Sequence, residues 1–169
     1  ALGLPPGLGG YADPAQRLTS CLGAALFSIP AIKGVEFGLG FDAARCAGSQ
    51  FHDEIVAENG PWGRFARTSN RAGGLEGGMT TGEQLVARVA MKPISTLRRA
   101  MATVDFATGE RVDSEYQRSD ITAVPAASVV GEAVVALELT RAFLAKFAGD
   151  SFEQLQAAVA DYRARLLRL

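Results

Sequence analysis

The chain carries a glycine-dense segment that runs directly into a strand-like segment. This order predicts tight turns followed by an extended strand near the middle of the chain. Residues 69–82 read SNRAGGLEGGMTTG and hold five glycines. Glycine tolerates positive φ and has no Cβ, so this segment predicts tight turns that pass close to a ligand or to other backbone. Apolar residues then alternate along one predicted strand face, namely Leu85, Ala87, Val89 and Met91.

The predicted strand ends in Lys92-Pro93-Ile94-Ser95-Thr96. A lysine beside two hydroxyls and backbone N–H groups can anchor a phosphate or the polar edge of a ring. The residues alone leave two interpretations open, a site for an anionic or phosphorylated ligand, or two turns joined by a strand with Lys92 solvated. The chain has neither a G-x-x-x-x-G-K-[ST] motif nor a G-x-G-x-x-G motif that opens a helix, so neither a P-loop nor a Rossmann site is predicted.

Local signals predict the first elements of the chain. Asp13-Pro14 predicts the start of a helix, and Pro30 predicts its end. The apolar face of that helix consists of Leu18, Leu22, Leu26 and Ile29. We expect a short strand over 34–38, a short helix over 41–46, irregular polar structure over 49–68, and a hairpin formed by 103–106 and 111–113.

Two further helices are predicted near the end of the chain. The first begins at Pro125, is closed by Gly149, and reads as a buried core helix. The stretch 124–147 cannot span a bilayer cheaply because it contains Glu132, Glu138, Arg141 and Lys146. The last helix is capped by Asp150 or Ser151, and its apolar face consists of Phe152, Leu155, Val159, Tyr162 and Leu166.

Length and composition favour one ordinary globular domain over residues 1–169. Apolar residues make up 48% and charged residues 21% of the chain, which suits a core without disulfide or metal staples. The 17 basic and 18 acidic residues give a net charge of −1, so charge alone suggests neither a nucleic-acid nor an anionic-membrane partner.

The cysteines and the first residues of the chain give information on the cellular compartment of the protein. Cys21 and Cys46 form no C-x-x-C pair, and we expect buried or half-buried thiols in a reducing cytoplasm. The first residues lack a basic region followed by a long apolar run, so no signal peptide is expected. The absence of an initiator Met leads us to expect a fragment or a processed chain.

Two other groups of residues could carry chemistry. Arg118-Ser119-Asp120 offers an arginine that can clamp an anion and an aspartate that can act as a base, or it forms a surface ion pair. His52, the only histidine, is followed by Asp53 and Glu54, and serves either as an acid–base group or as a simple hydrogen-bonding residue. The pattern supports no metal site.

Several blocks of residues resemble chorismate synthase in order and spacing, most closely over 31–125. They are Ala31-Ile32-Lys33-Gly34-Val35-Glu36, Gly48-Ser49 with His52-Asp53-Glu54, the 69–79 part of the glycine-dense segment, 92–96, Arg118-Ser119-Asp120, and Val124-Pro125. The resemblance is to the carboxy-terminal part of bacterial members. It implies an α+β fold in which helices are sandwiched with antiparallel β-sheets, here only in part.

The resemblance also implies an activity. Family members remove phosphate and a proton from 5-enolpyruvylshikimate 3-phosphate in a 1,4-anti elimination, which yields chorismate in the shikimate pathway. They need reduced FMN although the reaction has no net redox change. It further implies a cytoplasmic homotetramer.

The resemblance alone assigns roles to individual residues of this chain, at the positions that match the family's motifs. Gly77, the segment from Lys92 to Thr96, and Arg118 match FMN-contacting positions. Asp120 matches the aspartate that acts with flavin N5 in taking the substrate proton. Pro30 and Ala31 match another FMN-contacting pair, in which many members have Gln where this chain has Pro30.

Family members are much longer than this chain, and their catalytic histidines lie in the amino-terminal half, so His52 is not their counterpart. We therefore expect the 169-residue chain alone to be catalytically incompetent. The alternative is a non-catalytic binding or assembly domain that retains the fold, which the proline at position 30 favours.

Overall fold

Helices and small antiparallel sheets build an α+β fold in the computed structural model, which describes residues 1–117 and 121–169. The helical elements are η1 (Pro14–Gln16), α1 (Leu18–Phe27), η2 (Gly40–Arg45), α2 (Gly48–Phe51), α3 (Val124–Phe147) and α4 (Phe152–Leu166). The strands are β1 (Ile32–Phe37), β2 (Ile55–Val56), β3 (Ala66–Arg67), β4 (Leu75–Glu76), β5 (Met79–Thr80), β6 (Ala87–Met91), β7 (Ala102–Val104) and β8 (Arg111–Asp113).

The first helix forms as predicted, with a short 3₁₀ turn before it. The Asp13 carboxylate accepts a hydrogen bond from the Ala15 N–H at 2.9 Å and caps η1, in which Pro14 is the first residue. The α-helix proper then runs to Phe27, three residues before Pro30. Its predicted apolar face is confirmed, since Leu18, Leu22 and Leu26 are buried, and so is Ile29 just beyond its end. Cys21 and Cys46 are half-buried free thiols, as predicted.

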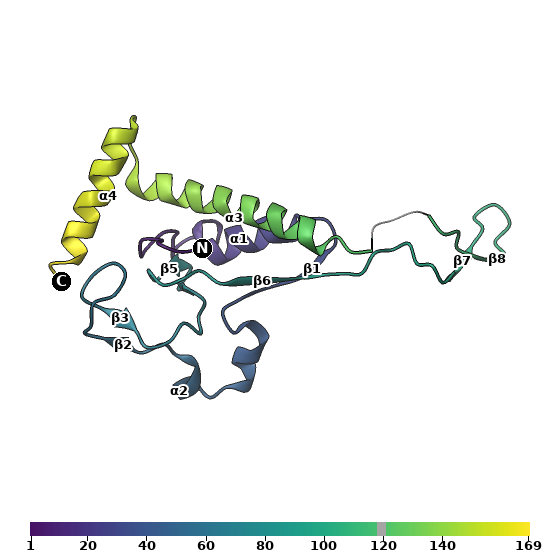
Figure 1. The fold of residues 1–169 in the computed structure, drawn as a ribbon, viewed down its shortest axis with the longest axis horizontal. Helices are drawn as coiled ribbons and strands as arrows, with labels where there is room; N and C mark the ends of the chain where they lie inside the picture. Colours follow the sequence, from purple (N-terminus) through teal and green to yellow (C-terminus); the bar gives the residue numbers. More distant parts are fainter. Residues whose placement is uncertain (118–120) are drawn as a thin grey trace.

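A two-stranded ribbon carries the packed centre of the chain. Strands β1 and β6 pair antiparallel, with Val35 opposite Val89 and Phe37 opposite Ala87. Helices α1 and α3 lie side by side over this ribbon (Figure 1). The larger buried cluster consists of Leu8, Leu18, Leu22, Leu75, Leu85, Leu139 and Phe147. Both predicted strands are therefore confirmed, with bounds shifted by up to two residues.

The segment between the two ribbon strands is more ordered than the sequence predicts. The predicted helix over 41–46 is the 3₁₀ helix η2. The prediction of irregular structure over 49–68 is wrong in part, because α2 and the β2–β3 pair lie there. Strands of two residues are too short to show alternation, so periodicity could not reveal them.

The predicted hairpin is confirmed as β7 and β8, which pair antiparallel. It lies at the end of an arm, residues 97–117, that projects away from the body of the molecule (Figure 1). Every residue of this arm is exposed, including Phe106 near its tip. In the chain, the arm follows β6 and precedes α3.

The long helix α3 is buried on one side only, so the prediction of a buried core helix is wrong for its other side. Leu139 and Phe147 are buried, whereas Leu137 is 60% and Leu144 is 51% exposed. The reason is that α1 packs against one side of α3, while the outer side carries apolar residues in contact with solvent. None of the helices in the described ranges is long and apolar enough to cross a membrane.

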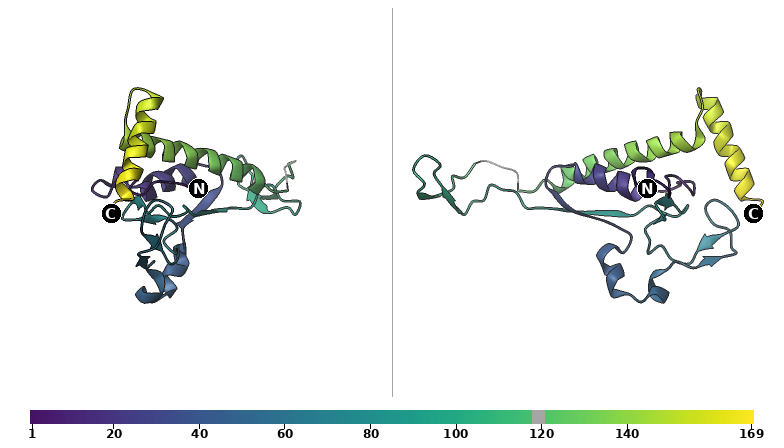
Figure 2. Two further views of the ribbon diagram at one scale, coloured as in Figure 1. Left: turned by 60° about the vertical axis from the view of Figure 1, so that its left-hand side comes forward. Right: turned by 180° about the vertical axis from the view of Figure 1, so that it is seen from behind.

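The last helix is confirmed and turns steeply away from the direction of α3 at the end of that helix (Figure 2). The Ser151 hydroxyl caps it by accepting a hydrogen bond from the Gln154 N–H at 3.3 Å. Leu155, Val159 and Tyr162 pack against the larger buried cluster. Phe152, predicted on this face, is 68% exposed because it is the first helical residue and lies beyond the packed part.

Candidate functional site

The segment after β6 lines a cavity of about 520 Å³, here called the Lys92 cavity. Its lining residues are Ala31, Met91, Lys92, Pro93, Ile94, Ser95, Thr96, Ile121, Thr122, Ala123 and Val124. Two stretches that are distant in the sequence thus meet, the exit from β6 and the entry to α3. The lining of this cavity includes two parts of the predicted FMN set, Ala31 and the whole segment from Lys92 to Thr96.

Backbone geometry fixes Ala31 beside Lys92. Ala31 has φ +70°, an unusual conformation for a residue other than glycine, and its carbonyl oxygen accepts the Lys92 N–H at 2.8 Å. Pro30, the other residue of the predicted pair, is exposed and does not line the cavity. Of this pair, Ala31 has the strained backbone and lines the Lys92 cavity. This fits the tendency of backbone strain to concentrate at functional sites.

The amino-terminal end of α3 forms the opposite wall of the Lys92 cavity. Ala123 occupies the N-cap position and offers no side-chain acceptor, but the Thr122 hydroxyl accepts a hydrogen bond from the Val124 N–H at 3.3 Å. The partial positive charge of a helix N-terminus favours an anion, as does the Lys92 ammonium group. Arg118 and Asp120, the predicted clamp and base, lie outside the described residues, directly before the segment that forms this wall.

Gly77 lines a different cavity, of about 610 Å³, here called the Gly77 cavity. Its walls come from Phe37, Gly40, Ala43, Phe51, His52, Asp53, Arg67, Ala72, Leu75, Glu76 and Gly77. Gly77 and Gly78 form the two-residue turn between β4 and β5, with φ of +58° and +86°. Such a type I′ turn requires positive φ at both positions, which explains both glycines.

The predicted FMN set is therefore divided between two cavities within one chain. Gly77 does not line the Lys92 cavity, and none of the 92–96 segment lines the Gly77 cavity. The extended strand β6 separates the two groups. His52 is exposed at the rim of the Gly77 cavity, where its ring packs edge-on against Phe51 with centroids 5.5 Å apart.

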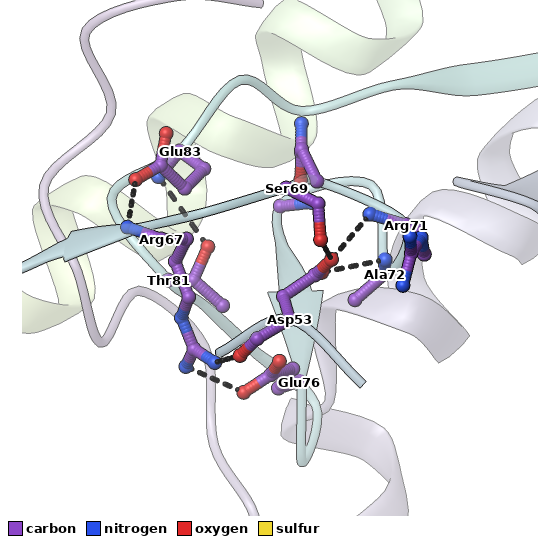
Figure 3. Close-up of polar contacts among 10 residues, drawn as sticks. Asp53, Arg67, Ser69, Arg71, Ala72, Glu76, Thr81 and Glu83 are labelled. Carbon is purple, nitrogen blue, oxygen red and sulfur yellow. Dashed lines mark hydrogen bonds and ion pairs between the residues drawn. The ribbon is translucent and has the colours of Figure 1, made fainter. Parts of the chain in front are cut away.

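A buried carboxylate beside the Gly77 cavity is the group that sequence reasoning missed. Asp53 accepts hydrogen bonds from the Ser69 hydroxyl at 2.5 Å, the Arg71 N–H at 2.8 Å and the Ala72 N–H at 2.9 Å (Figure 3). Its three donors lie 16 to 19 residues further along the chain, so no local pattern could have revealed them.

The charge state of Asp53 follows from these contacts. Burial by itself raises the pKa of this carboxyl, but the hydrogen bonds from Ser69, Ala72 and Arg71 and the nearby Arg67 charge outweigh it. The net result is a pKa below the ordinary value of 3.8. Asp53 is therefore an anion near neutral pH and a weaker proton acceptor than an ordinary carboxylate.

Comparison with known proteins places the chain. The family model of chorismate synthase matches residues 1–144. The chorismate synthase of Rubrobacter xylanophilus is 54% identical over 166 residues, which cover 98% of this chain and 42% of that protein. The chorismate synthase of Mycobacterium bovis is 56% identical over 163 residues, which cover 96% of this chain and 40% of that protein. The chain thus spans about two fifths of the length of these relatives.

A solved structure agrees with the sequence matches. A crystal structure of chorismate synthase superposes with a TM-score of 0.81 at 42% identity, over 99% of this chain and 42% of that one. The match therefore includes the ribbon, the helices over it and the segments that line both cavities. On the family model, the relatives and this structure together, the chain belongs to the chorismate synthase family.

Proposed function

We propose that the protein to which this chain belongs is a chorismate synthase, and that the chain supplies part of its FMN site. The observation that carries the proposal is the Lys92 cavity, in which Ala31 and the whole segment from Lys92 to Thr96 meet the N-terminus of α3. The proposal treats residues 1–169 as one domain within the longer enzyme.

The residues present fit a phosphorylated ring ligand. A cavity of about 520 Å³ is within the range of small-molecule sites. The Lys92 ammonium group, the hydroxyls of Ser95 and Thr96 and the N-terminal end of α3 all favour a phosphate or the polar edge of a ring. Apolar Ile94 and Val124 offer surface for a flat ring. Gly77 lines the second cavity, and we propose that assembly of the whole enzyme brings it to the same cofactor.

The proposed reaction is the 1,4-anti elimination of phosphate from 5-enolpyruvylshikimate 3-phosphate. The electron pair of a ring C–H bond enters the new conjugated system, the C–O bond to phosphate breaks, and phosphate leaves with that bond's electrons. Bound reduced FMN would supply transient electron density without net oxidation. Arg118 is proposed to bind the cofactor, and Asp120 to receive the ring proton.

The proposed setting of the enzyme is a cytoplasmic homotetramer. The isolated 169-residue chain is not expected to make chorismate, because it spans only about two fifths of the relatives' length. Chorismate formation by this chain alone would contradict that expectation.

The test uses the full-length protein and compares two cation substitutions. Lys92→Gln is expected to weaken FMN binding about tenfold, the effect of losing one charge-assisted contact. Arg45→Gln is the control, since this exposed cation pairs with Asp42 and lines neither cavity. Calorimetric titration with FMN gives the dissociation constants. Equal binding by both variants would remove Lys92 from the cofactor site.

A second substitution separates an enzyme from a domain that keeps only the fold. Asp120→Asn in the full-length protein is expected to abolish chorismate formation while FMN still binds. Full-length wild-type protein that neither binds FMN nor forms chorismate would instead support the non-catalytic binding or assembly role, which Pro30 at a cofactor-matching position favours.

A further inference from the structure

Asp53 is the only charged side chain buried among the described residues, with 7% of its surface exposed. A buried carboxylate is costly unless hydrogen bonds replace its lost hydration. Asp53 receives three, one from a hydroxyl and two from backbone N–H groups (Figure 3). The chain thus concentrates strong, charge-assisted hydrogen bonds at one point of the fold.

These hydrogen bonds hold the segment that leads into the glycine turns. Ser69, Arg71 and Ala72 donate directly to Asp53. Asn70, between them, accepts the Gly74 N–H on its side-chain oxygen at 2.7 Å and donates to the Gln84 carbonyl at 2.8 Å. The entry to β4 is therefore fixed by side-chain contacts in addition to its two-residue ladder.

Arg67 connects the Asp53 segment to the other side of the same turn. One guanidinium nitrogen donates to the Asp53 carbonyl at 2.8 Å, and another pairs with the Glu76 carboxylate at 2.7 Å. Glu76 directly precedes Gly77. Asp53 and Arg67 thus hold the glycine turn from its entry and from its last strand residue, while a Cβ placed on Gly77 would meet nothing within 4 Å.

We infer that Asp53 is a positioning residue that fixes the Gly77 turn against the cofactor in the assembled enzyme. The inference rests on the proposed function, because it takes FMN as the group that approaches Gly77. The Asp53 carboxylate acts through Ser69, Arg71 and Ala72. Arg67 joins the Asp53 backbone carbonyl to Glu76 and so supports the other side of the turn independently of that carboxylate. The contacts of its carboxylate are used up within the chain, so its effect on the ligand is indirect.

The main test is Asp53→Asn in the full-length protein. An amide keeps the shape but places an NH₂ group against at least one N–H donor, so the turn loses an anchor and gains an unsatisfied donor. We expect FMN binding to weaken about tenfold. The matched control is Asp105→Asn in the arm, an exposed carboxylate that accepts from the Ala107 and Thr108 N–H groups and should leave FMN binding unchanged.

Two milder variants keep the inference testable if Asp53→Asn does not fold. Ser69→Ala removes one hydrogen bond and leaves both backbone donors in place, so a smaller loss of FMN affinity is expected. Arg67→Gln leaves the Asp53 carboxylate fully bonded but breaks the connection to Glu76, and should also weaken FMN binding.

The readouts are the FMN dissociation constant, the absorption band of bound flavin and the free energy of unfolding in urea. A merely structural Asp53 would lower the free energy of unfolding but leave the dissociation constant and the absorption band of the folded variants unchanged, which would overturn the inference. Failure of the wild-type protein to bind FMN would overturn the proposed function and this inference together, so the two failures are distinguishable.

Discussion

Gly77 and Gly78 occupy adjacent positions of one turn but meet different surroundings. Both have positive φ. A Cβ on Gly77 points into open space, whereas a Cβ on Gly78 would lie 2.5 Å from Arg17 Cγ and 2.7 Å from the Gly10 carbonyl oxygen. The first glycine is therefore required only by φ, and the second by φ and by packing.

This difference gives a prediction for the pair. Gly77→Asn should change stability by less than about 1 kcal/mol, because Asn tolerates the left-handed region. Gly78→Ala should destabilise the protein by more than about 2 kcal/mol, since the backbone carbonyl cannot move aside cheaply. Urea unfolding of the full-length variants measures both. If FMN approaches Gly77, Gly77→Asn should nevertheless weaken FMN binding. Equal destabilisation by both changes would refute the conclusion that only Gly78 is required by packing.

Asp53 also predicts a dependence of stability on pH. Its pKa in the folded protein lies below the ordinary 3.8, so the stabilisation is fully present above that value and is lost as pH falls through the folded-state pKa. Asp53→Asn should be less stable than wild type near neutral pH, and the difference should shrink in acid. Urea unfolding from about pH 7 down to about pH 3 tests the expectation; a constant difference across that range would contradict it.

At the level of elements, the sequence predicted those whose signals are local. The face of α1, the alternation of β6, the hairpin around Gly109 and the cap of α4 depend on neighbouring residues only. The β2–β3 pair depends on contacts between distant residues, and strands of two residues carry no period. Local sequence patterns cannot predict contacts between residues that are distant in the chain.

In the candidate site, too, only the part formed by neighbouring residues could be predicted. Lys92 to Thr96 form one cavity wall because they are contiguous. Gly77 was grouped with them by resemblance to the family's FMN-contacting positions. That resemblance does not show that the extended strand β6, which advances about 3.3 Å per residue, lies between the two groups. The exposed outer side of α3 was mispredicted because apolar content does not say which partner covers a helix.

Helix α4 offers a test at this scale. The Tyr162 hydroxyl donates to the Pro6 carbonyl at 2.9 Å and ties the end of the chain to its beginning. Tyr162→Phe should lower the free energy of unfolding by about 1 kcal/mol, the usual effect of one hydrogen bond. Tyr116→Phe, at an exposed position of the arm, is the control and should have no measurable effect in urea unfolding. Similar losses in both variants would argue against this contact.

At the scale of the whole molecule, the outer side of α3 is one of several places where large apolar side chains are exposed. Its outer stripe consists of Val130, Leu137 and Leu144, spaced seven residues apart and all exposed. Positions seven apart share one helix face, so the three side chains form one row along the helix, with Thr140 and Arg141 between the last two. Exposed apolar side chains gathered on one face favour association.

The isolated chain is therefore expected to self-associate. Analytical ultracentrifugation should find species above 17.7 kDa. Replacing the three stripe residues by Glu should shift the chain toward monomer with little change in its free energy of unfolding. Val134 and Val135 pack toward α1, so Glu there should unfold the chain instead. A monomeric wild-type chain would show that the stripe alone does not drive association.

The Lys92 cavity lies where the two ends of the arm meet the body, with Lys92 to Thr96 on one side and Ile121 to Val124 on the other. A ligand that contacts both sides closes the intervening loop in the manner of a removable cross-link. Loop-closure entropy grows only slowly with loop length, so a long arm adds little to the cost of such closure. Shortening the arm by a few residues should therefore change the dissociation constant of such a ligand only slightly.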